Sequence, residues 1–183
     1  SSFYKYLQRI EEIKTNPLAF HKALKVAKRV QVPFSEKEIV SVLDGVQGED
    51  FPSVRDKLLV ELLYSTGMRR EELIGLKYNS VDFGNAMIKV LGKRNKERYI
   101  PLLQSVKKTL QKYIELKEVE FGFTEYLIVS NKGNKLYGTL VYRIIKFYFS
   151  RESTKVKKSP HVIRHSFATH LLNEGADLNS VKE

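Results

Sequence analysis

The sequence predicts a mainly helical domain that carries a small antiparallel sheet. Apolar residues recur at helical spacing over most of the 183-residue chain, whereas three short stretches between residues 86 and 131 have the shorter period of strands. Hydrophobic residues make up 42% of the chain and charged residues 29%, as in an ordinary globular protein. This length suits one domain with a sizeable core and an appendage.

The first 33 residues differ in pattern from the rest. Residues 3–13 place apolar side chains on one helical face, and this helix pattern ends at the tripeptide TNP. Residues 18–34 then drift from apolar to basic without firm periodicity up to Pro33, which is typical of a linker. We therefore expect a boundary near Pro33, with an N-terminal segment at 1–33 and the main domain at 34–183.

Helix signals open the main domain. Ser35 and Glu38 form the capping-box pattern S-E-K-E ahead of an apolar stripe. Pro52 stands where proline favours the first turn of a helix, and that helix pattern runs to Gly67, a C-terminal cap. Further helical patterns occupy about 103–118, 139–150 and 160–173, the last ending at Gly175.

The period changes between these helices. The stretches AMIKVLG (86–92) and ERYIPL (97–102) are strand-like, and residues 92–96 would close them into a hairpin. A lone hairpin is only marginally stable. We therefore expect EYLIVSN (125–131) to complete a three-stranded antiparallel sheet.

Basic residues dominate the charge of the chain. Thirty-two Lys and Arg face 21 Asp and Glu, a net charge of +11, and they cluster at 89–98 and 151–158. A basic surface can serve solubility alone, but clustering is what a phosphate footprint requires, so we favour a nucleic acid as partner. An RNA-binding module is a weaker alternative, because no aromatic stacking platform or RNA motif is evident.

Several function classes lack support in the sequence. The N-terminal residues have no secretory pattern, no apolar run is long enough to cross a bilayer, and no cysteine is present for disulfides or soft metal sites. We expect a cytoplasmic protein that has no membrane association and needs no cofactor.

Two histidine pairings deserve separate interpretations. His161 and Arg164 share one face at the start of a helical pattern, where backbone N–H groups and the helix dipole favour an anion such as phosphate. Taken alone, such a short match is more often structural. His161 and His165 have the spacing of some zinc ligands, but no Glu lies between them in the metalloprotease manner, so we expect no metal site. We expect His165 and His170 to be hydrogen-bonded structural residues.

A second cationic stretch, STGMRREELIGL, places Arg69 just after the turn at Gly67 and Glu72 three residues further on. An arginine at a helix start can present two parallel N–H donors to a phosphate, and Glu72 could orient it. The alternative is an ordinary surface ion pair. Lys93 stands in the predicted hairpin loop, and the sequence around it does not have the P-loop pattern of a nucleotide site. A lysine at a hairpin tip can, however, donate a proton.

Together these stretches resemble the tyrosine recombinase (integrase) family, and within it the Xer-type site-specific recombinases. The segments STGMRREELIGL, VLGKRNKERYIPL and SPHVIRHSFATHLLNEGADL stand in the family's order and at about its spacing. The resemblance covers about residue 35 onward and implies the family's catalytic-domain fold over 34–183. It also implies that 1–33 hold the last helix of an N-terminal DNA-clamping domain and the interdomain linker.

The resemblance assigns roles to five residues. Arg69 and Arg164 match the two catalytic arginines and Glu72 the acidic residue that supports the first, while Lys93 matches the hairpin lysine and His161 the histidine of the H-x-x-R pair. The family's tyrosine attacks a DNA phosphodiester, forms a 3′-phosphotyrosyl link and needs neither metal nor ATP. In that scheme the arginines stabilise the transition state, the lysine protonates the leaving 5′-oxygen and the histidine assists proton transfer. DNA phosphates would meet Arg94, Lys96, Arg98, Lys157 and Lys158.

The pattern departs from the family at the C-terminal end. In Xer-type enzymes a further His or Trp and then the nucleophilic tyrosine follow the segment that here reads GADLNSVKE, and the ten tyrosines of this chain all precede His161. We therefore expect a catalytic domain truncated at its C-terminus, monomeric by itself, that binds double-stranded DNA without cleaving it. The full-length protein would recombine DNA as a homo- or hetero-tetramer. The alternative is a non-catalytic DNA-binding protein that keeps the fold.

Overall fold

The computed structural model describes residues 2–21, 31–92 and 96–177. The chain divides into two compact units, Ser1–Val30 and Gln31–Glu183. No helix in the described part of either unit is long and apolar enough to cross a membrane.

A short helix, α1 (Ser2–Arg9), is the regular element in the described part of the first unit, and none of its residues is buried. The sequence predicted a longer helix over 3–13. It ends early because Glu11 has a φ of 61°, in the left-handed region through which a right-handed helix cannot continue.

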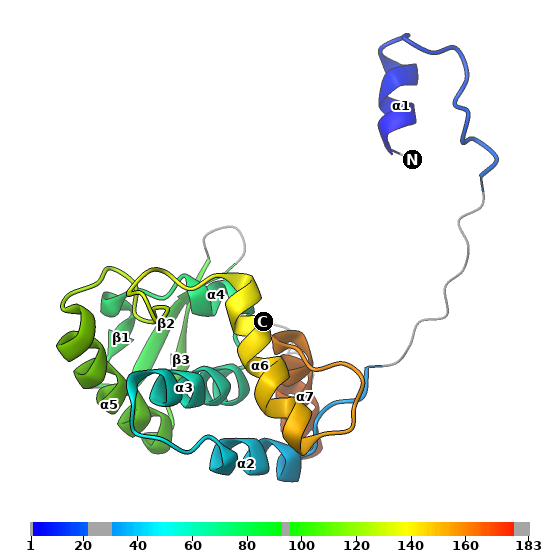
Figure 1. Cartoon of the computed structure of the whole chain (residues 1–183). Helices are drawn as coiled ribbons and strands as arrows, with labels where there is room; N and C mark the ends of the chain where they lie inside the picture. Colours follow the sequence, from blue (N-terminus) through cyan, green and yellow to red (C-terminus); the bar gives the residue numbers. More distant parts are fainter. Residues whose placement is uncertain (1, 22–30, 93–95, 178–183) are drawn as a thin grey trace. The chain divides into compact units, whose positions relative to one another are not determined.

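The second unit is mainly helical and carries a three-stranded antiparallel sheet, as predicted (Figure 1). Its helices form in the places that the apolar periodicity indicates. The elements in chain order are α2 (Glu36–Gly45), α3 (Phe51–Thr66), α4 (Arg70–Ile74), η1 (Tyr78–Ser80), β1 (Val81–Asp82), β2 (Met87–Leu91), β3 (Glu97–Pro101), α5 (Gln104–Phe121), α6 (Gly138–Glu152) and α7 (Pro160–Asn173).

The start of α2 confirms the predicted capping box. The amide of Glu38 donates to the Ser35 hydroxyl at 3.3 Å, and the Glu38 carboxylate accepts from the Ser35 amide at 2.7 Å. Two of the free N–H groups that every helix start leaves are thereby satisfied, which fixes where α2 begins.

α3 is the central helix of the unit. It packs against α2, α4, α5, α6 and α7 (Figure 1). Ten of the 16 residues of α3 are buried, and burial of its apolar side chains stabilises the core. The side chains of α3 that are fully buried are Leu58, Leu59, Val60, Leu62 and Leu63.

The third strand of the sheet is not the predicted one. β1 pairs with β2 through Val81 and Ile88, and β2 pairs with β3, whereas residues 125–131 form only isolated bridges. Their backbone groups find other partners: the amide of Leu127 donates to a main-chain carbonyl at 2.8 Å, and that of Val129 donates to the Tyr113 hydroxyl at 3.0 Å. A buried extended segment satisfied in this way has the sequence pattern of a strand without needing a sheet partner.

The turn after α3 confirms Gly67 as its C-terminal cap. Gly67 has φ 58° and ψ 18°, the left-handed conformation that glycine tolerates best. A Cβ at this position would lie 2.3 Å from the ring of Phe167 on α7. The turn is therefore both a chain reversal and the surface on which α7 docks.

Gly67→Ala should lower the free energy of unfolding by about 3 kcal/mol, because it adds left-handed strain and a clash with the Phe167 ring. Gly175→Ala is the matched control, since Gly175 also has a positive φ but no atom lies within 4 Å of its Cβ position. The control should cost at most about 1 kcal/mol. Urea unfolding of the two variants measures the difference, and equal losses would show that close packing on Phe167 is unimportant.

Candidate active site

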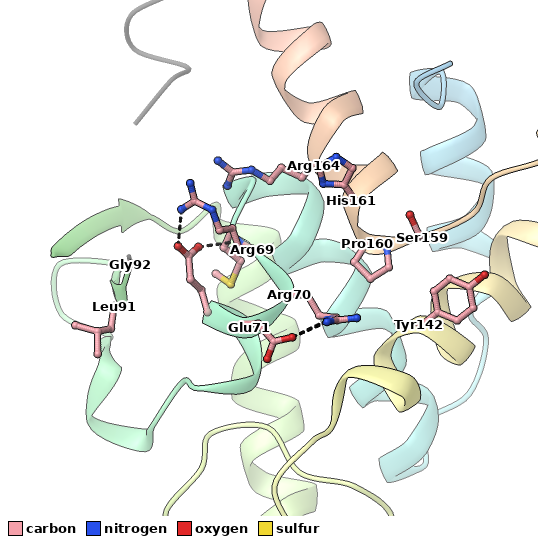
Figure 2. Close-up of a pocket in the computed structure, with 12 residues that line it drawn as sticks. Arg69, Arg70, Glu71, Leu91, Gly92, Tyr142, Ser159, Pro160, His161 and Arg164 are labelled. Carbon is pink, nitrogen blue, oxygen red and sulfur yellow. Dashed lines mark hydrogen bonds and ion pairs between the residues drawn. The ribbon is translucent and has the colours of Figure 1, made fainter. Parts of the chain in front are cut away.

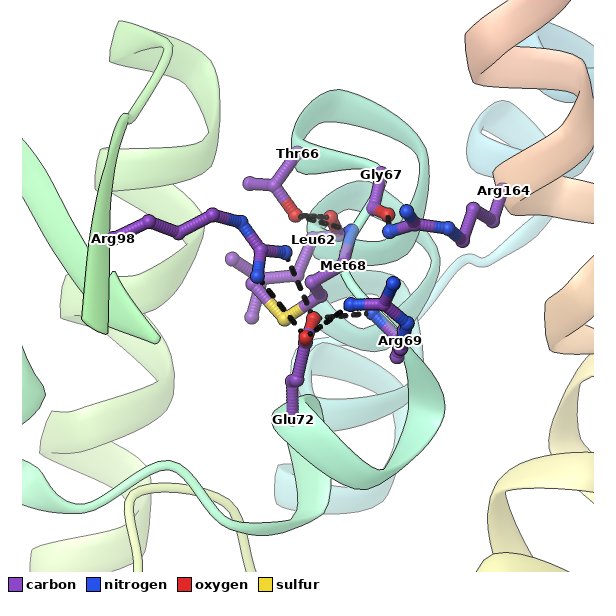
Figure 3. Close-up of polar contacts among 8 residues, drawn as sticks. All are labelled: Leu62, Thr66, Gly67, Met68, Arg69, Glu72, Arg98 and Arg164. Carbon is purple, nitrogen blue, oxygen red and sulfur yellow. Dashed lines mark hydrogen bonds and ion pairs between the residues drawn. The ribbon is translucent and has the colours of Figure 1, made fainter. Parts of the chain in front are cut away.

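Arg69 immediately precedes α4 and follows Gly67 by two positions. Its backbone is extended and its amide donates to the Glu72 carboxylate at 2.7 Å, so that Glu72 caps the helix that Arg69 precedes. The Arg69 guanidinium also contacts this carboxylate, at 2.9 Å, while 48% of its side chain stays exposed (Figure 3). One part of the guanidinium is thus fixed and the rest faces solvent.

Glu72 is the buried acceptor at the centre of this arrangement, with only 5% of its side chain exposed. Arg98 on β3 binds it in bidentate fashion, at 3.0 and 2.8 Å (Figure 3). Burial by itself would raise the pKa of the Glu72 carboxyl, but hydrogen bonds from Arg98 and from the amide and side chain of Arg69 outweigh it and lower the pKa to about 2. The carboxylate is therefore ionised at any physiological pH.

Arg98 was expected among the residues that contact DNA phosphates, and the structure places its side chain against Glu72 instead of in open solvent. It lies on the inward-facing positions of β3 with Ile100, while Glu97 and Tyr99 face outward. This alternation was visible in the sequence, because Arg98 stands two residues from an apolar position. Sequence reasoning missed the bidentate pair with Glu72.

α7 supplies two further predicted catalytic residues. Pro160 at its first turn favours the helix start, and His161 and Arg164 follow on one face. Arg164 donates a hydrogen bond to the backbone carbonyl of Gly67. Burial, and then the positive charge of Arg69, lower the pKa of the Arg164 guanidinium from its ordinary value. Two arginines that are close enough to repel each other form a site that an anion would stabilise.

The side chains of Arg69, Glu72, His161 and Arg164 line one pocket of about 910 Å³ (Figure 2). The two carboxylates in its wall, Glu71 and Glu72, are both paired with arginines. A second, smaller pocket of about 380 Å³ shares His161 and Arg164 with the first. Residues around the larger pocket are Met68, Arg69, Arg70, Glu71, Glu72, Leu91, Gly92, Tyr142, Ser159, Pro160, His161 and Arg164.

The remaining predicted site residues come from two stretches of the sequence, 93–96 and 157–158. Lys93 and Arg94 fall outside the described residues, although Gly92, which precedes them, lines the larger pocket. Lys96 is exposed, and its carbonyl accepts from the Gly92 amide at 2.8 Å. In the segment between α6 and α7, Lys157 is exposed and Lys158 half-buried.

The other histidines of α7 have different roles. The His170 ring is hydrogen-bonded to the Tyr64 hydroxyl at 2.9 Å, as predicted for a structural residue. His165 is exposed and lines the smaller pocket, and its ring has no hydrogen bond to any described residue, so the structure does not support its predicted structural role. Within the described ranges, no group of three or more side chains has the composition of a metal site.

Three pocket residues, Arg70, Tyr142 and Ser159, were not predicted as part of a site. Arg70 is paired with Glu71 at 2.7 Å and packs against Gly138, where a Cβ would lie 2.9 Å from its guanidinium carbon. Tyr142 projects from α6 toward the same pocket (Figure 2). The packing of α4 against α6 brings Arg70 and Tyr142 together, and neighbours in sequence do not reveal such a contact.

Because the pKa of Glu72 is low, the free energy of unfolding depends on pH in the acid range. Because the folded chain holds this proton less tightly than the unfolded chain, the stabilisation is complete above pH 4.5 and is lost as pH falls toward 2. Glu72→Gln should therefore cost about 2 to 3 kcal/mol at pH 7, and its difference from the wild type should shrink between pH 5 and pH 2.

Urea unfolding at a series of pH values measures this effect. The comparison with the wild type is needed because Glu38, paired with Lys155, also has a pKa lowered to about 2 and stays in both proteins. Glu125→Gln is the matched control, since it removes a carboxylate from an exposed ion pair with Lys77 and should change little. A gap between Glu72→Gln and wild type that is independent of pH would contradict the assignment.

Comparison with known proteins identifies relatives of the whole chain. The sequence model described as the phage integrase family matches residues 31–183. The tyrosine recombinase XerC of Chlorobaculum parvum is 36% identical over 205 residues, an alignment that covers all of this chain and 61% of that protein. The chain thus spans about three fifths of the length of this relative.

Solved structures of recombinases have the same fold. The crystal structure of XerA recombinase matches 97% of this chain and 61% of its own, with a TM-score of 0.73 and 25% identity. XerH site-specific recombinase, bound to its palindromic difH substrate in a post-cleavage complex, matches 98% of this chain and 56% of its own, with a TM-score of 0.82 and 21% identity. Because the family match covers most of the chain, and similar sequences and folds are those of tyrosine recombinases, the chain belongs to the phage integrase family of tyrosine recombinases.

Proposed function

We propose that this chain is part of a site-specific recombinase that cuts and rejoins duplex DNA through a 3′-phosphotyrosyl intermediate. The observation that carries the proposal is the convergence of Arg69, His161 and Arg164 on one pocket, with Arg69 held by the buried Glu72 carboxylate. We further propose that 34–183 form the catalytic domain and 1–33 the end of a DNA-clamping domain with its linker.

Charge stabilisation and proton transfer in the reaction each have a matching side chain in this chain. A tyrosine oxygen attacks phosphorus and loses its proton, while the bond from phosphorus to the 5′-oxygen breaks and that oxygen gains a proton. Negative charge gathers on the non-bridging oxygens, where Arg69 and Arg164 would stabilise it. His161 would assist proton transfer at the nucleophile, and Lys93 would protonate the leaving oxygen.

The electrostatics of the pocket support binding of a phosphodiester. Arg164 is partly desolvated beside a second guanidinium, so a phosphate between the two would relieve their repulsion. Both guanidiniums are anchored by a hydrogen bond before any ligand arrives, Arg69 to Glu72 and Arg164 to Gly67. Groups that are already oriented need little reorganisation as charge develops.

We propose that the nucleophilic tyrosine lies outside Ser1–Glu183, so that these residues alone bind double-stranded DNA as a monomer without cleaving it. The full-length recombinase would work as a homo- or hetero-tetramer. Tyr142 is the tyrosine in the described wall of the pocket, and it provides a direct test. If Tyr142→Phe abolished the covalent adduct of the full-length protein, the nucleophile would belong to this chain.

Arg69→Ala in the full-length protein should slow formation of the protein–DNA adduct on a nicked duplex by at least about 100-fold, because the guanidinium acts on transition-state charge. Affinity for the same duplex should change by less than about threefold. Arg69→Lys should also be slow, since lysine keeps the charge but not the fork of donors. Denaturing gels measure the adduct. If Arg69→Ala lost only affinity, the non-catalytic DNA-binding alternative would gain support.

DNA affinity of the 1–183 chain should fall steeply with salt, with a log–log slope of about −0.9 for each phosphate contacted. Lys157→Ala and Lys158→Ala should each make the slope shallower by about 1. Lys112→Ala removes the same charge from an α5 lysine paired with Glu49 and should leave the slope unchanged. Fluorescence anisotropy with a labelled duplex gives these slopes, and a flat dependence would exclude DNA as the partner.

A further inference from the structure

The segment that leads into the second unit, residues 31–34, is fixed at Phe34, which is fully buried. Its ring packs against Phe149 of α6, with 4.2 Å between ring centroids, and the Lys155 ammonium lies 5.6 Å from the Phe34 ring centroid. Lys155 in turn pairs with Glu38 at the start of α2. Phe34 is thereby held by α6, by α2 and by the segment that precedes α7.

A hydroxyl on α7 completes this attachment. The amide of Phe34 donates to the Ser166 hydroxyl at 2.7 Å, and that hydroxyl donates to the Val162 carbonyl one turn earlier at 2.9 Å. Ser166 is fully buried. Serine hydroxyls in helices commonly bond only to the carbonyl four residues earlier, whereas this one also satisfies a buried amide from a distant segment.

Ser166 and the catalytic residues lie on different faces of α7. Successive residues turn by about 100° around a helix, so Ser166 and Arg164, two positions apart, point in nearly opposite directions. Arg164 and Phe167 share the face that contacts the Gly67 turn. α7 is therefore fastened on one side to the Gly67 turn and on the other, through Ser166, to Phe34.

We infer that Ser166 is a positioning residue: by tying α7 to the segment that leads into this unit, it sets the rotation of the helix and so the placement of His161 and Arg164. A rotation of about 10° would move a guanidinium about 8 Å from the axis by more than about 1 Å. Displacements of this size can cost about 100-fold in rate. The consequence for catalysis rests on the proposed function, whereas the consequence for Arg164 placement does not.

The chain offers a matched set of variants. Ser166→Ala removes both hydrogen bonds, and Ser166→Thr keeps the hydroxyl and should restore the wild-type behaviour. Thr169→Ala is the control, because the Thr169 hydroxyl also donates to the carbonyl four residues earlier, at 2.9 Å to His165, from an exposed position. If Ser166→Ala does not fold, the near-isosteric Ser166→Cys, a weaker hydrogen-bonding group, takes its place.

In the 1–183 chain, Ser166→Ala should speed hydrogen exchange of the Phe34 amide by at least about tenfold. It should also shift the NMR signal of the Arg164 side chain, both free and with inorganic phosphate. In the full-length recombinase it should slow single-turnover adduct formation by about 10- to 100-fold while the Kd for DNA stays within about twofold. Ser166→Thr should restore all of these values, and Thr169→Ala should alter none.

A purely structural role would give a different result. Ser166→Ala would then lower thermal stability but leave the Arg164 signal and the single-turnover rate at wild-type values, and the inference would be wrong. If the wild-type full-length protein formed no adduct, the proposed function would fail instead, and the Arg164 signal of the 1–183 chain would still decide whether Ser166 positions α7.

Discussion

The Glu72 carboxylate, almost fully removed from solvent, accepts hydrogen bonds from two arginine side chains and a backbone amide, and the geometry of the site depends on it. Through these bonds it caps α4, fastens β3 to that cap by way of Arg98, and orients Arg69. A buried charge with fewer partners would be destabilising, so the three groups have to be present together. Because the same carboxylate serves the fold and the site, a change in one is expected to alter the other.

The Gly67 turn is the second element that brings the site together. It lets α3 end and places Arg69 immediately after a buried helix, and it exposes the carbonyl that receives Arg164 from α7. The close approach of Phe167 is possible only without a Cβ at Gly67. Two guanidiniums from segments almost a hundred residues apart are thus placed in one pocket by a single turn, despite their mutual repulsion. The hydrogen-bonded core around them offsets that cost.

The sequence predicted those parts of the structure that depend on local signals. The capping box at Ser35, the cap at Gly67 and the helix start at Pro160 each satisfy backbone groups within a few residues, so their patterns could be interpreted without knowledge of the fold. Residues 125–131 were wrongly predicted as a strand of the sheet, because their hydrogen-bond partners are a distant carbonyl and a tyrosine hydroxyl, which apolar periodicity does not encode. The same limit explains why the contact of Arg98 with Glu72, and the place of Arg70 and Tyr142 in the pocket wall, were not predicted.

The two attachments of α7 differ in chemistry, and this difference bears on how the site would respond to DNA. On the pocket side, the charged Arg164 guanidinium donates to the Gly67 carbonyl and is repelled by Arg69, so an incoming phosphate would act on this contact. On the far side, the Ser166 hydroxyl is neutral, buried and out of reach of any ligand. A helix that is anchored at its back by a contact insensitive to charge can keep its position while a phosphate binds the remaining N–H groups of Arg164, so that the bond to Gly67 is kept. Both arginines then stay oriented as charge develops, which electrostatic stabilisation of a transition state requires.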